Sequence, residues 1–418
     1  TATGRNDWAS QIAGSPSKSF FYPSVGLSWV PSSTWDLGNA FSYLKLRGSI
    51  ASVGLPFPRF LTTPTYEYDA TGKIWKDKTH YPIGDLKPER TITYEVGIDA
   101  RLWKNISLSA SWYSADTKNQ TFDPALPPSS SYTTIYLQTG HVRNTGVELS
   151  LGYSNQWRDF GWSSNFTFSW NKNEIIDLAS GALNPVTGQP LNLSELDIKG
   201  LGKAKYILKQ GGTLGDLYTT SDLKFNDNGY VEVDKAGNLL LTDEGDQIYL
   251  GSVFPSENLA WRNDFRYKGI NLGLLFTGRI GGICYSATQA NMDLYGVSEV
   301  SAAARDAGGV LINGREMVDA QKWYQAIGSQ SGLPQYYTYS ATNFRLQELS
   351  LGYTLPRKWF RNKMGLTVSF VGRNLWMIYC KAPFDPEAVA STGLSYQGID
   401  YFMMPSLRSL GFNVKFEF

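Results

Sequence analysis

Apolar and polar residues alternate along most of this chain, and this alternation limits the fold more than any other feature of the sequence. Near the chain end, Leu410, Phe412, Val414, Phe416 and Phe418 occupy every second position, with Gly, Asn, Lys and Glu between them. A period of two places the apolar residues on one face of a β-strand. A chain terminus is usually frayed and polar, so such a strand needs a surface that covers it. That surface is either a protein core or lipid.

The same two-faced pattern recurs throughout the sequence. Ile92, Tyr94, Val96 and Ile98 share one face of a predicted strand, and Ser, Thr, Asn, Glu, Lys and Arg fill the second face of nearly every such segment. We predict eleven strands, which begin near Phe21, Leu44, Ile92, Ile106, Val147, Trp162, Leu259, Ile270, Leu349, Leu366 and Leu410. Residues 1–5 have the character of the end of a further strand.

The connections between these strands alternate strictly between short and long. The short ones are 30–43, 104–105, 154–160, 268–269 and 356–363, and the long ones are 51–90, 115–143, 174–258, 282–342 and 376–405. Outer-membrane barrels have short periplasmic turns and long external loops. We therefore expect an all-β fold, a transmembrane antiparallel β-barrel. Its periplasmic end would hold Lys104, Asn105, Lys268 and Gly269, and its external loops His80, Asp234 and Trp323.

A large soluble all-β protein, such as a sandwich or a propeller, is the alternative, with the apolar faces forming its core. The polar second face favours a barrel, because a water-filled or plugged interior requires it. The sequence contains no run of about 18 apolar residues, so we expect no transmembrane helix. The aromatic content of 14% suits a chain of many strands. The formal charge is +1 and the sequence has no long charged blocks, so it does not predict a basic surface for nucleic acid.

Catalytic and metal-binding patterns are poorly represented. The two histidines, His80 and His141, both fall in predicted external loops, and there is no G-x-S-x-G motif. Residues 225–246 are rich in Asp, Asn and Gly, but a calcium-loop alignment places Lys224 where a carboxylate is needed. P-loop and zinc-ligand spacings are also absent from the sequence. We predict no catalytic residues, no metal site and no cofactor.

The two cysteines, Cys284 and Cys380, lie just beyond the predicted strands 270–281 and 366–376, and both open long loops. Two strand spacings of about 4.8 Å separate them around a barrel, which exceeds the limit of about 7 Å for a disulfide. Loops can bend, and a cell surface permits disulfides. The sequence is therefore compatible with a disulfide between Cys284 and Cys380, and also with two independent small residues that pack without a bridge.

Several sequence blocks resemble the C-terminal barrel half of SusC-like TonB-dependent outer-membrane transporters. They occur in the order of that family, and together they span nearly the whole chain from Phe21 to Phe418. Among them are TITYEVGIDARLW at 91–103, NTGVELSLGY at 144–153, FRLQELSLGYTLP at 344–356, GRNLW at 372–376, PFDPEA at 383–388 and SLGFNVKFEF at 409–418.

The resemblance implies a barrel of about 22 strands, of which this chain would supply about half. A signal sequence, an N-terminal domain, a TonB-contacting segment, a plug and the first barrel half are expected outside this chain. The implied activity is TonB-coupled import of oligosaccharides or oligopeptides through the outer membrane of a Gram-negative bacterium of the Bacteroidota type. The implied partners are a SusD-like surface lipoprotein, the TonB complex, the remaining barrel and plug, and outer-membrane lipid.

Other functions remain as alternatives. They are a TonB-dependent transporter of siderophores or metal chelates, a passive porin, and a soluble carbohydrate-binding or hydrolytic β-protein. The first two share the barrel with the favoured interpretation, whereas the third would need a buried core instead of a lipid-facing surface.

Two groups of aromatic residues are candidates for function. The first group lies in predicted external loops, where flat rings can stack on sugars or peptides, or else pack against other loops or a partner. Its members are Trp75, Trp323, Tyr324, Tyr336, Tyr337 and Tyr339. The second group is Phe416 and Phe418, which resemble the C-terminal signal for barrel insertion or are simply lipid-facing aromatics.

Overall fold

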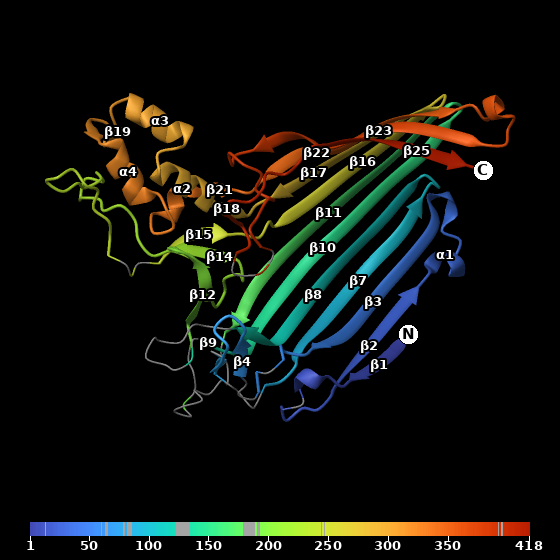
Figure 1. The fold of residues 1–418 in the computed structure, drawn as a ribbon. Helices are drawn as coiled ribbons and strands as arrows, with labels where there is room; N and C mark the ends of the chain where they lie inside the picture. Colours follow the sequence, from blue (N-terminus) through green and yellow to red (C-terminus); the bar gives the residue numbers. More distant parts are fainter. Residues whose placement is uncertain are drawn as a thin grey trace.

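A 12-stranded antiparallel sheet dominates the computed structural model of this protein (Figure 1). The structure describes residues 1–12, 14–59, 61–62, 66–77, 80–81, 86–122, 132, 134–178, 189, 193–243, 245, 247–391, 393 and 396–418. The strands of the sheet, in chain order, are β1 (Ala2–Asp7), β2 (Phe20–Trp29), β3 (Phe41–Leu55), β7 (Glu89–Leu102), β8 (Ile106–Phe122), β10 (Leu137–Trp157), β11 (Phe160–Asp177), β16 (Glu257–Tyr267), β17 (Ile270–Ile280), β22 (Asn343–Leu355), β23 (Gly365–Cys380) and β25 (Ser409–Glu417). The eleven predicted strands are confirmed, and residues 2–7 form the twelfth.

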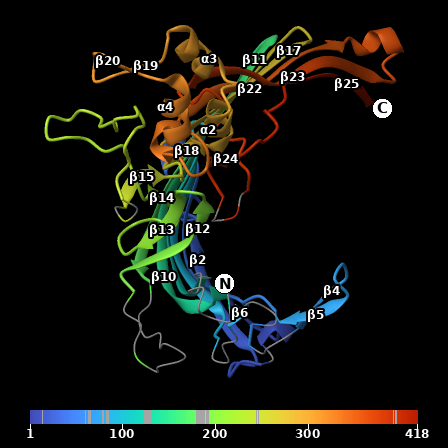
Figure 2. The same ribbon diagram turned by 60° about the vertical axis from the view of Figure 1, so that its left-hand side comes forward.

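The order of strands in the sheet is the order in the chain, as in an up-and-down barrel. Figure 2 shows that the sheet is strongly curved and open on one side. The two edges are β1 and β25, and within the described chain each of them pairs with one neighbour, β2 and β23 respectively. The sheet therefore has the form of part of a barrel wall.

Cross-strand register places the apolar residues on one face of the sheet. Leu272 stands opposite Phe265 on β16 and opposite Leu351 on β22. The row continues through Phe370 to Phe412, whose rings lie 5.8 Å apart. On interior strands Val96, Trp261 and Leu351 are 55%, 45% and 51% exposed, so large side chains of this face are not covered by the protein. An apolar face of this kind is suited to lipid.

The connections of the sheet alternate in length as predicted, but several strands are longer than the sequence indicated. The loop predicted at 115–143 is reduced to 123–136, because β8 continues to Phe122 and β10 begins at Leu137. His141 therefore lies on a strand and not in a loop. The turn predicted at 154–160 is reduced to Arg158 and Asp159. The ends of β8 and β10 at the long connection were missed because Ser114, Asp116 and Thr145 are polar residues on the otherwise apolar face, and the alternating pattern stops there.

The two longest connections fold into a unit that we call the loop subdomain, which consists of the described residues of 193–256 and 281–342 together with β24. In Figure 1 it lies at the left, at the opposite end of the sheet from the short turns. One sheet consists of β12 (Glu195–Leu201), β13 (Ala204–Lys209), β14 (Asp216–Thr219) and β15 (Ile248–Ser252), and another of β21 (Thr338–Ser340), β18 (Ile283–Ser286) and β24 (Ile399–Asp400). A hairpin of β19 (Val310–Ile312) and β20 (Glu316–Val318), the helices α2 (Ala287–Leu294), α3 (Glu299–Asp306) and α4 (Ala320–Ile327), and the 3-10 turn η3 (Pro334–Tyr337) complete it.

Short elements occupy the remaining connections. Two of the long connections contain the hairpin of β4 (Tyr66–Asp69) and β5 (Ile74–Asp77), and the parallel pair of β6 (His80–Tyr81) and β9 (Thr134–Ile135). The other short elements are α1 (Pro31–Thr34) and the 3-10 turns η1 (Ser10–Ile12), η2 (Gly38–Ala40) and η4 (Arg357–Phe360).

The main hydrophobic core lies in the loop subdomain and not inside the sheet. Tyr206, Leu217, Tyr285, Ile327 and Ile399 are members of one buried cluster that joins all parts of the subdomain. A second cluster ties β12, β13 and the connection to β14 to the ends of β8, β10 and β11. The loop subdomain is therefore folded protein, attached to one end of the sheet.

The helices of the loop subdomain begin at N-cap side chains. Ser286 accepts a hydrogen bond from the backbone N–H of Gln289 at the start of α2, and Asp319 accepts one from Lys322 at the start of α4. Each of these helices has eight residues. None of the helices in the described part of the chain has the length and apolar character needed to span a bilayer.

Candidate functional site

The polar face of the sheet carries charged residues that are mostly paired with each other. Lys45 and Asp99 lie 3.8 Å apart, and Arg47 forms an ion pair with Glu95. A second group joins β16, β22 and β23, because Glu348 lies 3.0 Å from Arg373 and 3.5 Å from Arg262, which also contacts Asp264 at 2.9 Å. Pairs between adjacent strands neutralise the polar wall and hold its side chains in place.

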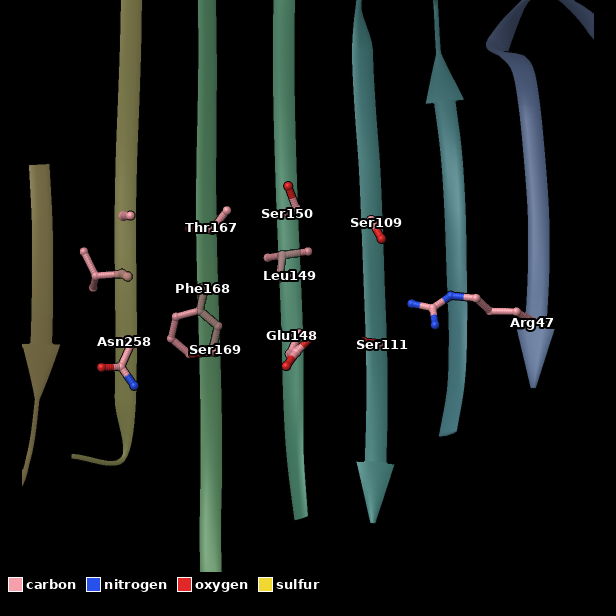
Figure 3. Close-up of a pocket in the computed structure, with 12 residues that line it drawn as sticks. Arg47, Ser109, Ser111, Glu148, Leu149, Ser150, Thr167, Phe168, Ser169 and Asn258 are labelled. Carbon is pink, nitrogen blue, oxygen red and sulfur yellow. The ribbon is translucent and has the colours of Figure 1, made fainter. Parts of the chain in front are cut away.

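A shallow pocket of about 350 Å³ lies on this wall across β8, β10, β11 and β16 (Figure 3). Ser109, Ser111, Ser150, Thr167 and Ser169 supply hydroxyl groups to its lining. Arg47 extends from β3 across β7 towards it. This arrangement offers hydrogen bonds but no nucleophile with an adjacent base, so the pocket is equipped for binding and not for covalent chemistry.

Glu148 is the carboxylate of this pocket. It stands opposite Ser111 on β8 and Ser169 on β11, and it is exposed. In the described part of the chain no lysine or arginine forms an ion pair with Glu148, in contrast to Glu95 and Glu348. The pocket can therefore accept a cationic group.

The last long connection, residues 381–408, is fixed to the wall by Arg345 on β22. The Arg345 guanidinium lies 2.8 Å from Oδ1 and 3.0 Å from Oδ2 of Asp385, and 3.1 Å from Oε1 of Glu387. The side chains of Arg345 and Asp385 are only 4% and 9% exposed. A planar guanidinium that meets a carboxylate at two points gives geometric specificity as well as energy.

Burial raises the pKa of Asp385, but hydrogen bonds from Arg345, Ser406 and the backbone N–H of Glu387 outweigh it, and the net pKa is lowered from the ordinary value of an aspartate. Asp385 is therefore ionised at neutral pH, as its role beside Arg345 requires.

The same connection runs through the loop subdomain. β24 pairs with β18 in parallel, and Ser286 donates a hydrogen bond to Asp400 at 2.7 Å. Tyr206 donates to the backbone carbonyl of Gln397. Residues 381–408 thus connect the loop subdomain to the wall at Arg345, and we call them the strap.

The predicted loop aromatics fall into buried and accessible groups. Tyr324 and Tyr337 are 7% and 2% exposed and belong to the core of the loop subdomain, which leaves little of either ring open to a ligand. Burial also raises the pKa of both phenols. Packing, the alternative that the sequence left open, accounts for these two.

The other predicted aromatics keep exposed surface. Trp75 on β5 is 69% exposed and lies 5.2 Å from Tyr68, measured between ring centroids. Trp323 on α4 meets Tyr336 edge to face at 6.1 Å, and burial raises the pKa of Tyr336 to about 12. Tyr339 is half-buried and donates a hydrogen bond to Gln289 at 2.6 Å. Ligand contact by these side chains stays a prediction.

Phe416 and Phe418, the predicted insertion signal, are exposed at the end of the chain. Phe416 stands opposite Leu366 on β23, and the two phenylalanine rings are stacked 6.5 Å apart. Their position on an edge strand fits either interpretation of the sequence, so the signal also stays a prediction.

The two cysteines are free thiols. Cys284 is buried on β18, where its thiol donates to the carbonyl of Tyr339, and Cys380 is the last residue of β23. The prediction that Cys380 lies beyond its strand was therefore wrong, since β23 continues four residues past Trp376. Of the two interpretations left open, the structure agrees with independent small residues.

Sequence reasoning missed Arg345, Asp385 and Glu148. PFDPEA was identified only as a block, although Asp385 and Glu387, two carboxylates on either side of Pro386 in a loop, are a signal for a cationic partner elsewhere. Within the described residues, no three side chains of His, Cys, Asp or Glu gather closely enough to hold a metal ion.

Comparison with known proteins places this architecture in context. Residues 1–252 match the family described as TonB dependent receptor-like, beta-barrel. TonB-dependent receptor P3 of Formosa agariphila is 25% identical, over 100% of this chain and 44% of its own length. TonB-dependent receptor SusC of Bacteroides thetaiotaomicron is 20% identical, over 80% of this chain and 32% of its own length.

The solved structures of the RagAB peptide importer are similar in fold. The closed-closed state matches with a TM-score of 0.74 at 21% identity, over 99% of this chain and 45% of that chain. The open-open state matches with a TM-score of 0.69 at 20% identity, over 99% and 44%. The chain thus spans less than half the length of the proteins that it matches.

Proposed function

This chain belongs to the family of TonB dependent receptor-like β-barrels, and on that premise we propose that it forms the C-terminal barrel portion of an outer-membrane nutrient importer. The observation that most supports the proposal is the 12-stranded sheet. Its strands follow chain order, one face is apolar and uncovered, and the other carries paired charges and hydroxyl groups. These are the requirements of a wall between lipid and a polar conduit.

We further propose that the sheet edges at β1 and β25 pair with the remaining strands of the barrel, and that the polar wall contacts a plug. An unpaired strand edge in lipid leaves backbone groups without hydrogen bonds, which costs several kcal/mol for each group. The hydroxyl-lined pocket around Glu148 is a suitable docking surface for a cationic side chain of the plug, because Glu148 has no ion-pair partner in the described wall.

The proposed cargo is an oligosaccharide or an oligopeptide, and the proposed partners are a SusD-like surface lipoprotein and the TonB complex. The likeness in fold to the RagAB importer and the sequence similarity to SusC support this assignment. In the proposed mechanism, a ligand is captured over the loop subdomain, the lipoprotein closes, and energy supplied through TonB displaces the plug. The chain carries out no covalent chemistry in this mechanism.

Trp75, Trp323, Tyr336 and Tyr339 are the proposed aromatic contacts for the ligand or the lipoprotein. Trp75 and Tyr68 stand opposite each other on the β4–β5 hairpin and are 69% and 50% exposed, so this pair has the largest free ring area of the set. Flat rings of this kind stack on sugars and on peptide side chains alike.

Uptake by intact cells tests the function. A strain that lacks the gene should lose energy-dependent uptake of a labelled oligosaccharide or a labelled oligopeptide, and the intact gene should restore it. Uptake that persists after the proton gradient is collapsed would support a passive porin instead. Loss of iron-chelate uptake alone would support a siderophore transporter, and recovery of the full-length protein from buffer without detergent would point to a soluble β-protein.

A further inference from the structure

Four basic residues follow one another along the apolar side of the sheet, near the ends of the strands that bear the long connections. They are Arg90 on β7, Lys118 on β8, Arg143 on β10 and Lys172 on β11. Each lies an even number of residues from an apolar side chain of its strand, such as Ile92 for Arg90, and therefore shares the face of that side chain. These positions are one on each of four neighbouring strands.

Strand register shows that the four residues lie at a similar depth. Arg90 stands directly opposite Lys118. Arg143 stands opposite Asp116, which lies two residues nearer the short turns than Lys118 does. Lys172 stands opposite Thr145, which lies two residues nearer the short turns than Arg143 does. Barrel strands tilt by about 35–45° from the barrel axis. Residues at equal depth in the membrane are therefore displaced along the strand by about one to two residues from each strand to the next. Figure 1 shows the oblique strands and their staggered ends.

The charges of this cluster are not balanced. Arg143 pairs with Asp116 at 3.0 Å, and Lys172 pairs with Glu174 at 2.7 Å. Counting Arg90, Lys118, Arg143 and Lys172 against Asp116 and Glu174 gives 4 − 2 = +2.

The excess charge belongs to Arg90 and Lys118. Arg90 Nε donates to the Ser52 hydroxyl at 2.9 Å, and in the described chain no carboxylate pairs with Arg90 or with Lys118. Like charges directly opposite each other on neighbouring strands are destabilising, so an anion between them would relieve the strain.

We propose that Arg90 and Lys118 bind the phosphate of a phosphorylated glycolipid in the outer leaflet, with Arg143 and Lys172 beside it. This inference rests on the proposed membrane orientation. A guanidinium matches phosphate geometry, and an ammonium adds a point charge. The site lies on the lipid side of the wall, immediately beyond Ile92 and Trp170, and these side chains would contact the acyl chains while the cations meet the headgroup. Binding of a soluble phosphate would not require apolar side chains beside the cations.

The experiment uses the full-length transporter, purified and delipidated in detergent, with diphosphoryl lipid A as the probe. The double variant R90Q/K118Q should bind lipid A about ten- to thirtyfold more weakly than the wild type, which corresponds to the loss of two interfacial cations. Lipid A from which both phosphates have been removed should bind the two proteins equally. K268Q, a change at the short-turn end of the sheet, is the matched control and should leave lipid A binding unchanged.

Equal binding of diphosphoryl lipid A by R90Q/K118Q and the wild type would overturn the inference. Displacement of lipid A by inorganic phosphate at millimolar concentration would also overturn it, in favour of a soluble-anion site. A wrong membrane orientation has a different signature. A cysteine at Asn105 would then react with an impermeant reagent on intact cells, which would contradict the proposed function itself.

Discussion

Arg345 on the barrel wall and Asp385 in the strap meet through two parallel hydrogen bonds, 2.8 Å and 3.0 Å long, in a place where both side chains are almost fully buried. Glu387 adds a second carboxylate at 3.1 Å. Breaking a buried pair by removing one partner leaves a charge without compensation, which costs about 3–5 kcal/mol. The geometry therefore makes this pair the main attachment of the strap to the wall.

The first prediction concerns this attachment. R345Q should release residues 381–408 from the wall and raise their hydrogen exchange and their cleavage by protease, while the wall itself stays folded. R373Q is the matched control, because Arg373 is 65% exposed in its pair with Glu348, and exposed pairs contribute about 1 kcal/mol or less. Equal protection of the strap in R345Q and the wild type would contradict the attachment.

The second prediction concerns pH. The pKa of Asp385 is lowered in the folded protein, so its contribution to stability is present above the unfolded pKa of about 3.9 and is lost as the pH falls through the lower folded value. Protease cleavage of the strap should therefore be constant between about pH 5 and 8 and rise only below about pH 4. In D385N the strap should be loose at every pH. A wild-type transition near neutral pH would mean that another group controls the strap.

The sequence predicted the wall well because strand alternation is a local property. The alternation of Ile92, Tyr94 and Val96 with polar residues identifies the apolar face of this strand from the segment alone. The same reasoning failed at the ends of β8 and β10, because Asp116 and His141, which contact each other at 2.7 Å, are polar and do not resemble lipid-facing residues.

Local sequence patterns could not predict the strap or the core of the loop subdomain, for a different reason. Arg345 and Asp385 are 40 residues apart, and Tyr206 contacts Gln397 across 191 residues, so only the folded chain brings these groups together. The burial of Tyr324 and Tyr337 follows from the same tertiary packing, which no spacing in the sequence reports.

The third prediction concerns topology. In a full-length protein without native cysteines, a cysteine in place of Trp323 should react with an impermeant thiol reagent on intact cells, and one in place of Asn105 should not. Trp323 lies on α4 in the loop subdomain, whereas Asn105 lies in the turn between β7 and β8 at the other end of the sheet. Reaction at Asn105 with protection at Trp323 would reverse the orientation.

The fourth prediction concerns the two faces of the wall. Leu108 and Ser109 are adjacent on β8 and point to opposite faces, which makes them a matched pair. L108R should cost about 2–4 kcal/mol in lipid if the site is near mid-depth, and S109R should be tolerated. L272R and F412R should resemble L108R, and N413R should resemble S109R. Folding titrations of the full-length protein in lipid vesicles give the comparison. Similar penalties on both faces would show that the apolar face does not meet lipid.

The last prediction concerns the two thiols. Burial, with smaller contributions from nearby acidic groups, raises the pKa of Cys284 to about 12, and only the thiolate reacts quickly with alkylating reagents. Cys284 should therefore stay unmodified in the native protein at pH 8, whereas the half-buried Cys380 at the end of β23 should react first. Unfolding without a reductant should make both available, because neither is bridged in the structure. Mass spectrometry of the alkylated peptides gives the result: C380A should remove the fast-reacting site and leave Cys284 protected, and a crosslinked peptide that contains both cysteines would refute the free-thiol assignment.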